Sequence, residues 1–218
     1  MKLISVKFLI FLLLIDLSFI FLSFIHHQFD LSLNDFLVYN DGGYAEKFQY
    51  LKFIGIVMIS FLIAIKRKSV PFLIFTIIPI YLFWDDSRLL HENFGYKIAL
   101  IIHKGSPSDI LIKNFKFIHI GEFFYMALVG FTLLMIYLLC LRLSDNKEKS
   151  LFQKILKLLL VYGFFAIILD FLIPFSTGSL NVLLSILEDG GEMIPISIIC
   201  SYFFDKIQSI RNKKLLHF

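Results

Sequence analysis

Five ionisable side chains crowd into the stretch WDDSRLLHE, directly after a run of fifteen residues that carries no charge. They are Asp85, Asp86, Arg88, His91 and Glu92. If the stretch is helical, Asp85, Arg88 and Glu92 share one face, so we expect Arg88 to neutralise Asp85 or Glu92. That pairing leaves Asp86 and His91 without an explanation. Carboxylates and imidazoles can bind metal ions and carry protons, so these two residues are candidates for such chemistry.

One straight helix cannot direct both Asp86 and His91 toward the same site, because they lie on different helical faces. Convergence would require a bend after Ser87, or an interfacial helix that starts there. The apolar segment before Asp85 is long enough to span a bilayer only if its helix continues through the DDSR sequence. We therefore predict that WDDSRLLHE forms the last turns of a membrane helix as it emerges from the bilayer.

Three further segments carry acids at the ends of apolar runs. His119 and Glu122 in HIGEFF are three residues apart, a carboxylate–imidazole spacing that metal sites in helical bundles use. Glu188 and Glu192 in LEDGGE are four apart and share a face, provided that this segment is helical rather than a loop. Asp170 ends another apolar run, where an ionised carboxylate is costly unless it faces a polar interior.

Two more acids, Asp41 and Glu46, flank the glycines that precede the second apolar segment. Glu46 would occupy the first helical turn, where an acid favours the helix dipole. Asp16 differs from all of these, because it lies in the middle of the first apolar segment with no local partner. An acid at that depth is a candidate functional group, or a protonated side chain that bonds a neighbouring helix.

Oxygen ligands combined with imidazoles suit Zn²⁺, Mn²⁺ or Mg²⁺, so a divalent metal ion is the expected cofactor if these residues converge. A spare carboxylate, Glu122 or Glu188, would then act as the catalytic general base. The predicted metal ligands are Asp86, His91, His119, Asp170 and Glu192. The predicted supporting and ion-pairing residues are Asp41, Glu46, Asp85, Arg88 and Glu92.

The composition is typical of a membrane protein. Of 218 residues, 58% are hydrophobic and 27 are Phe, and the mean hydropathy is +0.82. One soluble core could not bury this much apolar surface, so the surplus must face lipid.

The net charge of +4 does not indicate nucleic-acid binding, because the basic residues lie beside apolar segments rather than in a patch. Cys140 and Cys200 fall in apolar runs without a CxxC motif, so we expect two buried thiols.

Six segments are long and apolar enough, or nearly so, to span a bilayer. They are residues 5–26, 45–65, 69–88, 118–142, 152–173 and 181–205. The third is expected to kink at Pro79. The sequence NFGYKIALIIHKG after it could form an amphipathic helix in the membrane interface. With no internal repeat and no low-complexity linker, residues 1–218 are predicted to form one all-α membrane domain. We expect a bundle of six transmembrane helices with that interfacial helix between the third and fourth.

The charged residues orient this bundle. With the N-terminus in the cytoplasm, 14 of the 21 Lys and Arg residues fall on the cytoplasmic side, as the positive-inside rule requires. Thirteen of the 17 acids fall at or near the opposite side, which that rule does not explain. We therefore predict both termini in the cytoplasm and one polar site that opens to the outer face. Richness in Phe, Ile, Leu and Lys with little Ala suggests an AT-rich bacterial genome, so the membrane that we expect is the bacterial cytoplasmic (inner) membrane.

Three functions fit these patterns. The preferred one is a metal-dependent hydrolase or transferase that acts on a membrane lipid at the level of its head group. The second is a proton- or cation-coupled transporter or channel with Asp16 and Asp170 as relay residues, although the inner halves of helices two to six carry almost no ionisable residues. The third is a non-catalytic subunit of a membrane complex. The sequence leaves open whether the protein is an enzyme and whether it pairs with a second copy of itself.

Overall fold

Helices account for nearly all of the chain that the structure describes. The computed structural model describes residues 3–29, 33–102, 111–112, 115–116 and 118–215. Its elements are α1 (Leu3–Phe29), η1 (Asn34–Phe36), α2 (Tyr44–Arg67), α3 (Val70–Phe75), α4 (Ile77–Ser87), α5 (Leu90–Ile102), β1 (Leu111–Ile112), β2 (Phe115–Lys116), α6 (Ile118–Leu143), α7 (Asn146–Gly163), η2 (Phe164–Leu169), α8 (Asp170–Leu172), η3 (Ile173–Phe175) and α9 (Ser179–Leu215). The two short strands pair with each other in an antiparallel ladder. The all-α prediction is confirmed.

Within the described residues, five helical segments are long and apolar enough to cross a membrane. They are Ser5–Phe29, Tyr44–Arg67, Val70–Ser87, Ile118–Leu143 and Asn146–Phe175, which match the first five predicted segments. The sixth predicted segment lies within α9, a continuous helix of 37 residues that is not among these five. It includes the LEDGGE sequence, so that sequence is helical, as Glu188 and Glu192 require in order to share a face.

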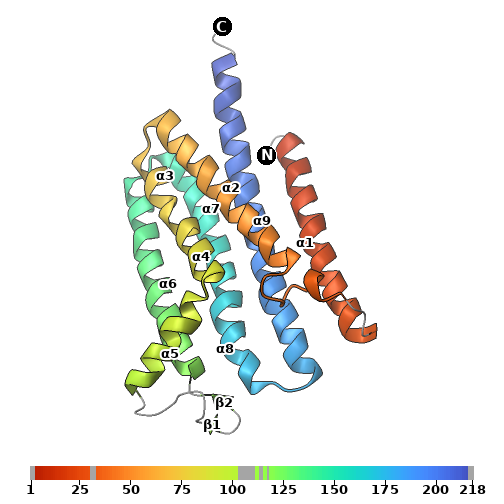
Figure 1. Ribbon diagram of the computed structural model, residues 1–218. Coiled ribbons are helices and arrows are strands. Elements are labelled where there is room, and N and C mark those ends of the chain that lie inside the picture. The colour runs from red at the N-terminus through yellow and green to blue at the C-terminus, as the bar shows by residue number, and fades with distance from the viewer. Residues whose placement is uncertain (1–2, 30–32, 103–110, 113–114, 117, 216–218) are drawn as a thin grey trace.

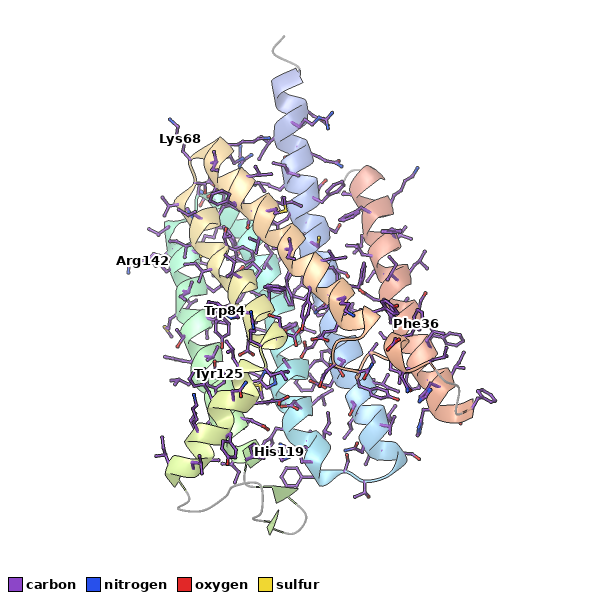
Figure 2. The ribbon with its side chains drawn as sticks, viewed as in Figure 1. Phe36, Lys68, Trp84, His119, Tyr125 and Arg142 are labelled. Atoms are coloured by element: carbon purple, nitrogen blue, oxygen red, sulfur yellow. The ribbon has the colours of Figure 1, made fainter. Side chains whose placement is uncertain are left out.

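The long helices run side by side, and both chain ends lie at the same end of the bundle (Figure 1). The helix α9 packs against α1, α2 and α7. α3 contacts both α2 and α6. Basic side chains such as Lys68 and Arg142 lie toward the end with the termini, and His119 lies toward the other end (Figure 2). We call these the basic end and the histidine end.

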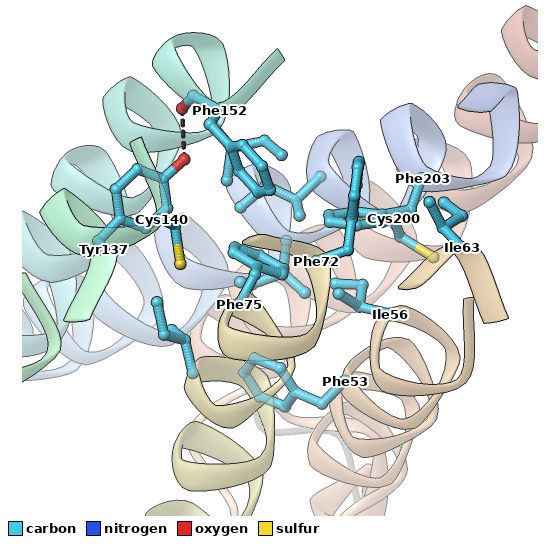
Figure 3. Close-up of a cluster of buried hydrophobic side chains, with 14 of the residues drawn as sticks. Phe53, Ile56, Ile63, Phe72, Phe75, Tyr137, Cys140, Phe152, Cys200 and Phe203 are labelled. Atoms are coloured by element: carbon cyan, nitrogen blue, oxygen red, sulfur yellow. Dashed lines mark hydrogen bonds between the residues drawn. The ribbon is translucent and has the colours of Figure 1, made fainter. Parts of the chain in front are cut away.

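An aromatic core fixes the helices toward the basic end. Phe72, Phe75, Phe152 and Phe203 are each 0–1% exposed, and the rings of Phe75 and Phe203 stack with their centroids 5.0 Å apart. The hydroxyl of Tyr137 donates a hydrogen bond to the backbone carbonyl of Phe152, which links α6 to α7 (Figure 3). Interlocked rings of this kind contribute more than their buried area alone.

The two cysteines lie in the same apolar core. Cys140 and Cys200 are buried and unbonded, so the prediction of two buried thiols is confirmed.

The third predicted span is one helix broken in its first half. α3 and α4 are separated at Thr76, three residues before Pro79. Proline has no N–H, so it cannot bond the carbonyl one turn earlier, and the helix is weakened there. The hydroxyl of Thr76 bonds the carbonyl of Phe72 at 2.8 Å and approaches the Ser60 hydroxyl at 3.1 Å. The regular helix is therefore interrupted at Thr76, and the kink at Pro79 stays a prediction.

The chain also bends where α4 gives way to α5. α4 continues through Ser87, as the predicted span length required. Leu89 then adopts a left-handed backbone conformation with φ of 50°, which is unfavourable for a side chain with a Cβ and ends the helix. The bend that Asp86 and His91 required is therefore found between Ser87 and Leu90.

After this bend, α5 packs tightly along α6. A Cβ atom added at Gly121 would lie 2.0 Å from the backbone oxygen of Gly95, so no side chain fits between the two helices at that point. Ala99, one turn further along α5, is fully buried. α5 is thus held against α6 backbone to backbone, which fixes the start of α5 relative to the start of α6.

Candidate functional site

A hydrogen-bonded chain of four side chains joins α4, α5 and α6 near the histidine end. The Nδ1 atom of His91 lies 3.2 Å from Oδ2 of Asp85. The hydroxyl of Tyr81 donates to Oδ1 of Asp85 at 3.1 Å and lies 2.8 Å from the hydroxyl of Tyr125. A carboxylate that holds one imidazole nitrogen orients the ring and makes the other nitrogen a stronger base.

The surroundings of His91 favour its protonated form. Burial alone would lower the pKa of this imidazole, because it disfavours the charge. The hydrogen bond and the charge of Asp85 outweigh burial, and Asp170 and Glu92 add to the effect, so the pKa of His91 is raised above its ordinary value. His91 is therefore suited to accept a proton.

The chain leaves the helix at Arg88 and bends at Leu89, and this explains why the expected pairing of Arg88 is wrong. A continuous helix would place Arg88 over Asp85 and Glu92. The helix instead ends before Leu89, and the turn carries His91 back onto Asp85, six positions earlier. Arg88 is exposed, and within the described part of the chain it forms no ion pair with either acid.

A second imidazole–carboxylate pair lies at the start of α6. Nδ1 of His119 is 2.8 Å from Oε2 of Glu122, so the predicted i,i+3 pair is formed. Glu122 is 8% exposed, and it lies directly beside Gly95 of α5. The close α5–α6 contact therefore brings the second pair near the first.

Asp170, at the start of α8, completes this group. It lies within electrostatic range of both histidines and of Glu122 and Glu92. We call the set made of Asp85, His91, His119, Glu122 and Asp170 the histidine cluster. It combines two imidazoles, each with its own carboxylate, and a third carboxylate within electrostatic range of both imidazoles.

A separate cavity of about 50 Å³ gathers most of the remaining predicted acids. We call it the acidic chamber, and its polar lining is Asn40, Asp41, Glu46, Gln49, Asp86, Asp189 and Glu192. Glu46 lies in the first turn of α2, as predicted, and it accepts hydrogen bonds from the Gly42 N–H and the Tyr50 hydroxyl. Gln49 is 5% exposed, and its amide has no hydrogen-bond partner among the described protein groups.

Adjacent residues of α4 divide these two regions. Asp85 belongs to the histidine cluster, whereas Asp86 lines the acidic chamber. Tyr162 of α7 lies within electrostatic range of Glu192 and Asp86 in the acidic chamber and of Asp85 in the histidine cluster. Glu188 is partly buried within electrostatic range of Asp189, Glu192 and Asp170, so it lies at the edge of the chamber.

The sequence interpretation missed Lys52. This lysine is 3% exposed, and its Nζ lies 2.8 Å from Oδ1 of Asp16, which is fully buried. The Nζ atom also donates to the carbonyl of Met193 at 3.1 Å and to Oγ of Ser197 at 3.2 Å, and Ser197 donates to Oδ2 of Asp16 at 2.5 Å. Asp16 therefore has a partner, supplied by α2. The available signal was a lone charge eight residues inside an apolar helix.

The predicted metal site is not supported by the geometry. Among the side chains that the structure describes, no group of three or more His, Cys, Asp or Glu is arranged to hold a metal ion. The five predicted ligands are divided, with Asp86 and Glu192 in the acidic chamber and His91, His119 and Asp170 in the histidine cluster. Asp30 and Asp109 are among the thirteen acids expected at or near the outer side, and both lie outside the described residues.

Comparisons with curated proteins and with solved structures found no match. One family model matches residues 53–205. The match runs from within α2 into α9, so it includes the histidine cluster. Of the acidic chamber it includes Asp86, Asp189 and Glu192, while Asn40, Asp41, Glu46 and Gln49, like Asp16 and Lys52, lie before it. The chain belongs to the family described as a domain of unknown function, DUF8692.

Proposed function

We propose that the protein is a membrane-embedded hydrolase or transferase whose histidine cluster performs acid–base chemistry on a lipid-level substrate. The observation that carries the proposal is the hydrogen-bonded chain Tyr125–Tyr81–Asp85–His91 beside a second imidazole–carboxylate pair. Two such pairs can divide the work of a transfer reaction. One accepts a proton from the attacking hydroxyl, and the other returns a proton to the leaving group.

The residues take defined roles in this proposal. His91, oriented by Asp85, is the general base, and Nε2 faces the substrate. The His119–Glu122 pair is the general acid. The two pairs replace the metal-activated water of the sequence interpretation, because imidazole–carboxylate geometry is present in the described residues and a three-ligand group is not.

The membrane arrangement that this function needs is also a proposal. We infer that α9 is a sixth span, because it runs alongside α2 and α7 and returns the chain to the end that holds the N-terminus (Figure 1). The basic end would face the cytoplasm of a bacterial inner membrane, and α5 would lie at the outer interface. A reporter that is active only outside the cytoplasm, fused after Phe218, is expected to be inactive. An active fusion would contradict this topology.

The enzymatic proposal is tested by lipid analysis of cells that express the protein. Lipid extracts from cells with wild-type protein are compared by mass spectrometry with extracts from cells with His91→Gln or Asp85→Asn at equal membrane abundance. Loss of a general base lowers rates by about 10²–10⁴. We expect a lipid product with wild-type protein that falls by that order in both variants.

The matched control is His27→Gln, because His27 lies at the end of α1 and outside the cluster. It is expected to give the wild-type lipid profile. Identical profiles for wild-type protein and all variants would overturn the enzymatic proposal.

A second candidate function is favoured by the Lys52–Asp16 pair. Lys52 bonds the carbonyl of Met193, and Met193 itself lines the acidic chamber. Ionisable groups thus continue from the chamber toward the middle of the bundle, as a proton- or cation-coupled transporter would require. Uptake of protons or Na⁺ into proteoliposomes, above that of empty liposomes and lost in Asp86→Asn, would favour transport. No flux above that of empty liposomes would exclude it.

A further inference from the structure

A second, larger cavity lies beside the histidine cluster. Its volume is about 160 Å³, and it is enclosed by α4, α6, α7 and η2. Most of its wall is apolar, with Leu133, Leu134, Leu156 and Leu159 among the lining residues. We call it the apolar cavity. A cavity of 150 Å³ with such walls stays dry and admits benzene, so this one has room for roughly six carbon atoms.

Small residues create this space. Gly130 on α6, and Gly163 and Ala166 on α7 and η2, all line the cavity. A Cβ atom added at Gly163 would meet nothing within 4 Å, so the room is open at that point. The π-helical segment η2 begins at the next residue, and such segments interrupt regular helix packing, frequently at functional sites.

The polarity of the cavity changes from one end to the other. Tyr81, Asp85 and Tyr125 line it toward the histidine end, and they belong to the hydrogen-bonded chain that ends at His91. The leucines line it toward the basic end. A polar group at the first end would meet hydroxyls and a carboxylate, whereas deeper atoms would meet mostly hydrocarbon, with Tyr137 and Tyr162 as the other tyrosines of the wall. The Tyr137 hydroxyl is already bonded to the carbonyl of Phe152.

The cavity also reaches the outer surface of the bundle. Leu160 lines it, yet 59% of this residue is exposed, on a segment that is apolar enough to span a membrane. A molecule could therefore enter sideways from the bilayer. An aqueous solute would need to pass between Tyr81, Asp85 and Tyr125 and then enter apolar surroundings. Transfer of a polar group from water into such surroundings is unfavourable.

We propose that the apolar cavity binds the end of a lipid acyl chain and places the attached head group or ester linkage at the Tyr81–Asp85–His91 chain. This inference rests on the proposed function and gives it a substrate class, an acyl lipid taken from the membrane. The occupant is an acyl chain because the space is apolar and opens at membrane depth, and it carries a polar group at one end.

The test uses full-length protein in nanodiscs that contain a phosphatidylcholine with a diazirine in its acyl chain. After illumination, labelled peptides are mapped by mass spectrometry. We expect label to concentrate on cavity residues such as Met126 and Val129 rather than on Leu128 and Phe131, which are exposed on the outside of α6.

A cavity-filling substitution provides the comparison. Gly163→Phe places a ring into open space, so the protein is expected to fold and to lose at least nine-tenths of the cavity label. Val161→Phe is the matched control, because Val161 is exposed on the same helix and does not line the cavity. It is expected to label like wild-type protein. A thermal unfolding midpoint of Gly163→Phe at or above that of wild-type protein shows that the loss is not caused by misfolding.

The outcomes separate this inference from the proposed function. Label spread evenly over exposed residues, or cavity label unchanged in a folded Gly163→Phe variant, overturns the acyl-chain site. Cavity label in a protein whose expression gives no lipid product dependent on His91 leaves the site standing and removes the enzymatic proposal. A product that depends on His91 but is formed equally by Gly163→Phe removes the acyl-chain site alone.

Discussion

Removing either member of the Lys52–Asp16 pair should strongly destabilise the protein. The two side chains are 2% and 0% exposed, so neither charge can be solvated by water if its partner is lost. Asp16→Asn keeps the shape of the side chain but leaves the Lys52 ammonium with only the neutral oxygens of Met193 and Ser197. Breaking a buried pair from one side costs about 3–5 kcal/mol. We expect the free energy of unfolding to fall by about 3 kcal/mol or more.

The double variant sharpens this prediction. Replacing both residues, as Asp16→Leu with Lys52→Met, removes both charges, and such replacements are often close to neutral. The double variant should therefore lose less free energy of unfolding than Asp16→Leu and Lys52→Met lose together when each is measured alone. The difference should be about 2 kcal/mol or more. Additive losses would show that the two groups do not stabilise each other.

The assay is equilibrium unfolding in mixed detergent micelles, followed by circular dichroism. Lys66→Met is the control, because Lys66 is exposed on the same helix, and surface changes stay within about 0.5 kcal/mol. An Asp16→Asn variant that loses less than about 1 kcal/mol would refute the view that this pair is a buried, mutually dependent charge pair.

Three further predictions concern the α4–α5–α6 region. Because the pKa of His91 is raised in the folded protein, its pairing with Asp85 should stabilise fully below about pH 6.5 and weaken as pH rises through the raised pKa. The difference in unfolding midpoint between wild-type protein and His91→Gln should therefore shrink from pH 6 to pH 9, and a constant difference would contradict this. Gly121→Ala should separate α5 from α6, because its methyl group would meet the Gly95 oxygen, and faster amide hydrogen exchange in α5 would report it. Leu89→Gly should be more stable than Leu89→Ala by about 1 kcal/mol, since φ is positive there, and equal stabilities would argue against a left-handed Leu89.

The sequence predicts the helices well because a membrane span has a simple physical requirement. Apolar runs of sufficient length marked the first five spans, and the DDSR extension of the third was needed to reach that length. The left-handed Leu89 could not be predicted, because leucine carries no local signal for that conformation. The pairing of Arg88 with Glu92 failed for this reason, since it depended on a helix that continues past Leu89. Its pairing with Asp85 failed because Arg88 has already left the helical conformation, with φ of −120°.

The candidate site was predicted in part. The His119–Glu122 pair depends only on spacing within one helix, so it could be read from the sequence. The partner of Asp16 lies 36 positions away on another helix, and the division of acids between two regions depends on how four helices pack. Packing of that kind has no periodic signature in a single chain.

The last turn of α4 lies between the histidine cluster and the acidic chamber. Asp85 and Asp86 are adjacent in the chain, yet each belongs to a different compartment. Successive side chains of a helix point about 100° apart, so this single turn of α4 directs one carboxylate into each compartment. The compartments are linked electrostatically, because Asp86 lies within electrostatic range of both Asp85 and His91. A change of charge at either position is therefore felt in both compartments.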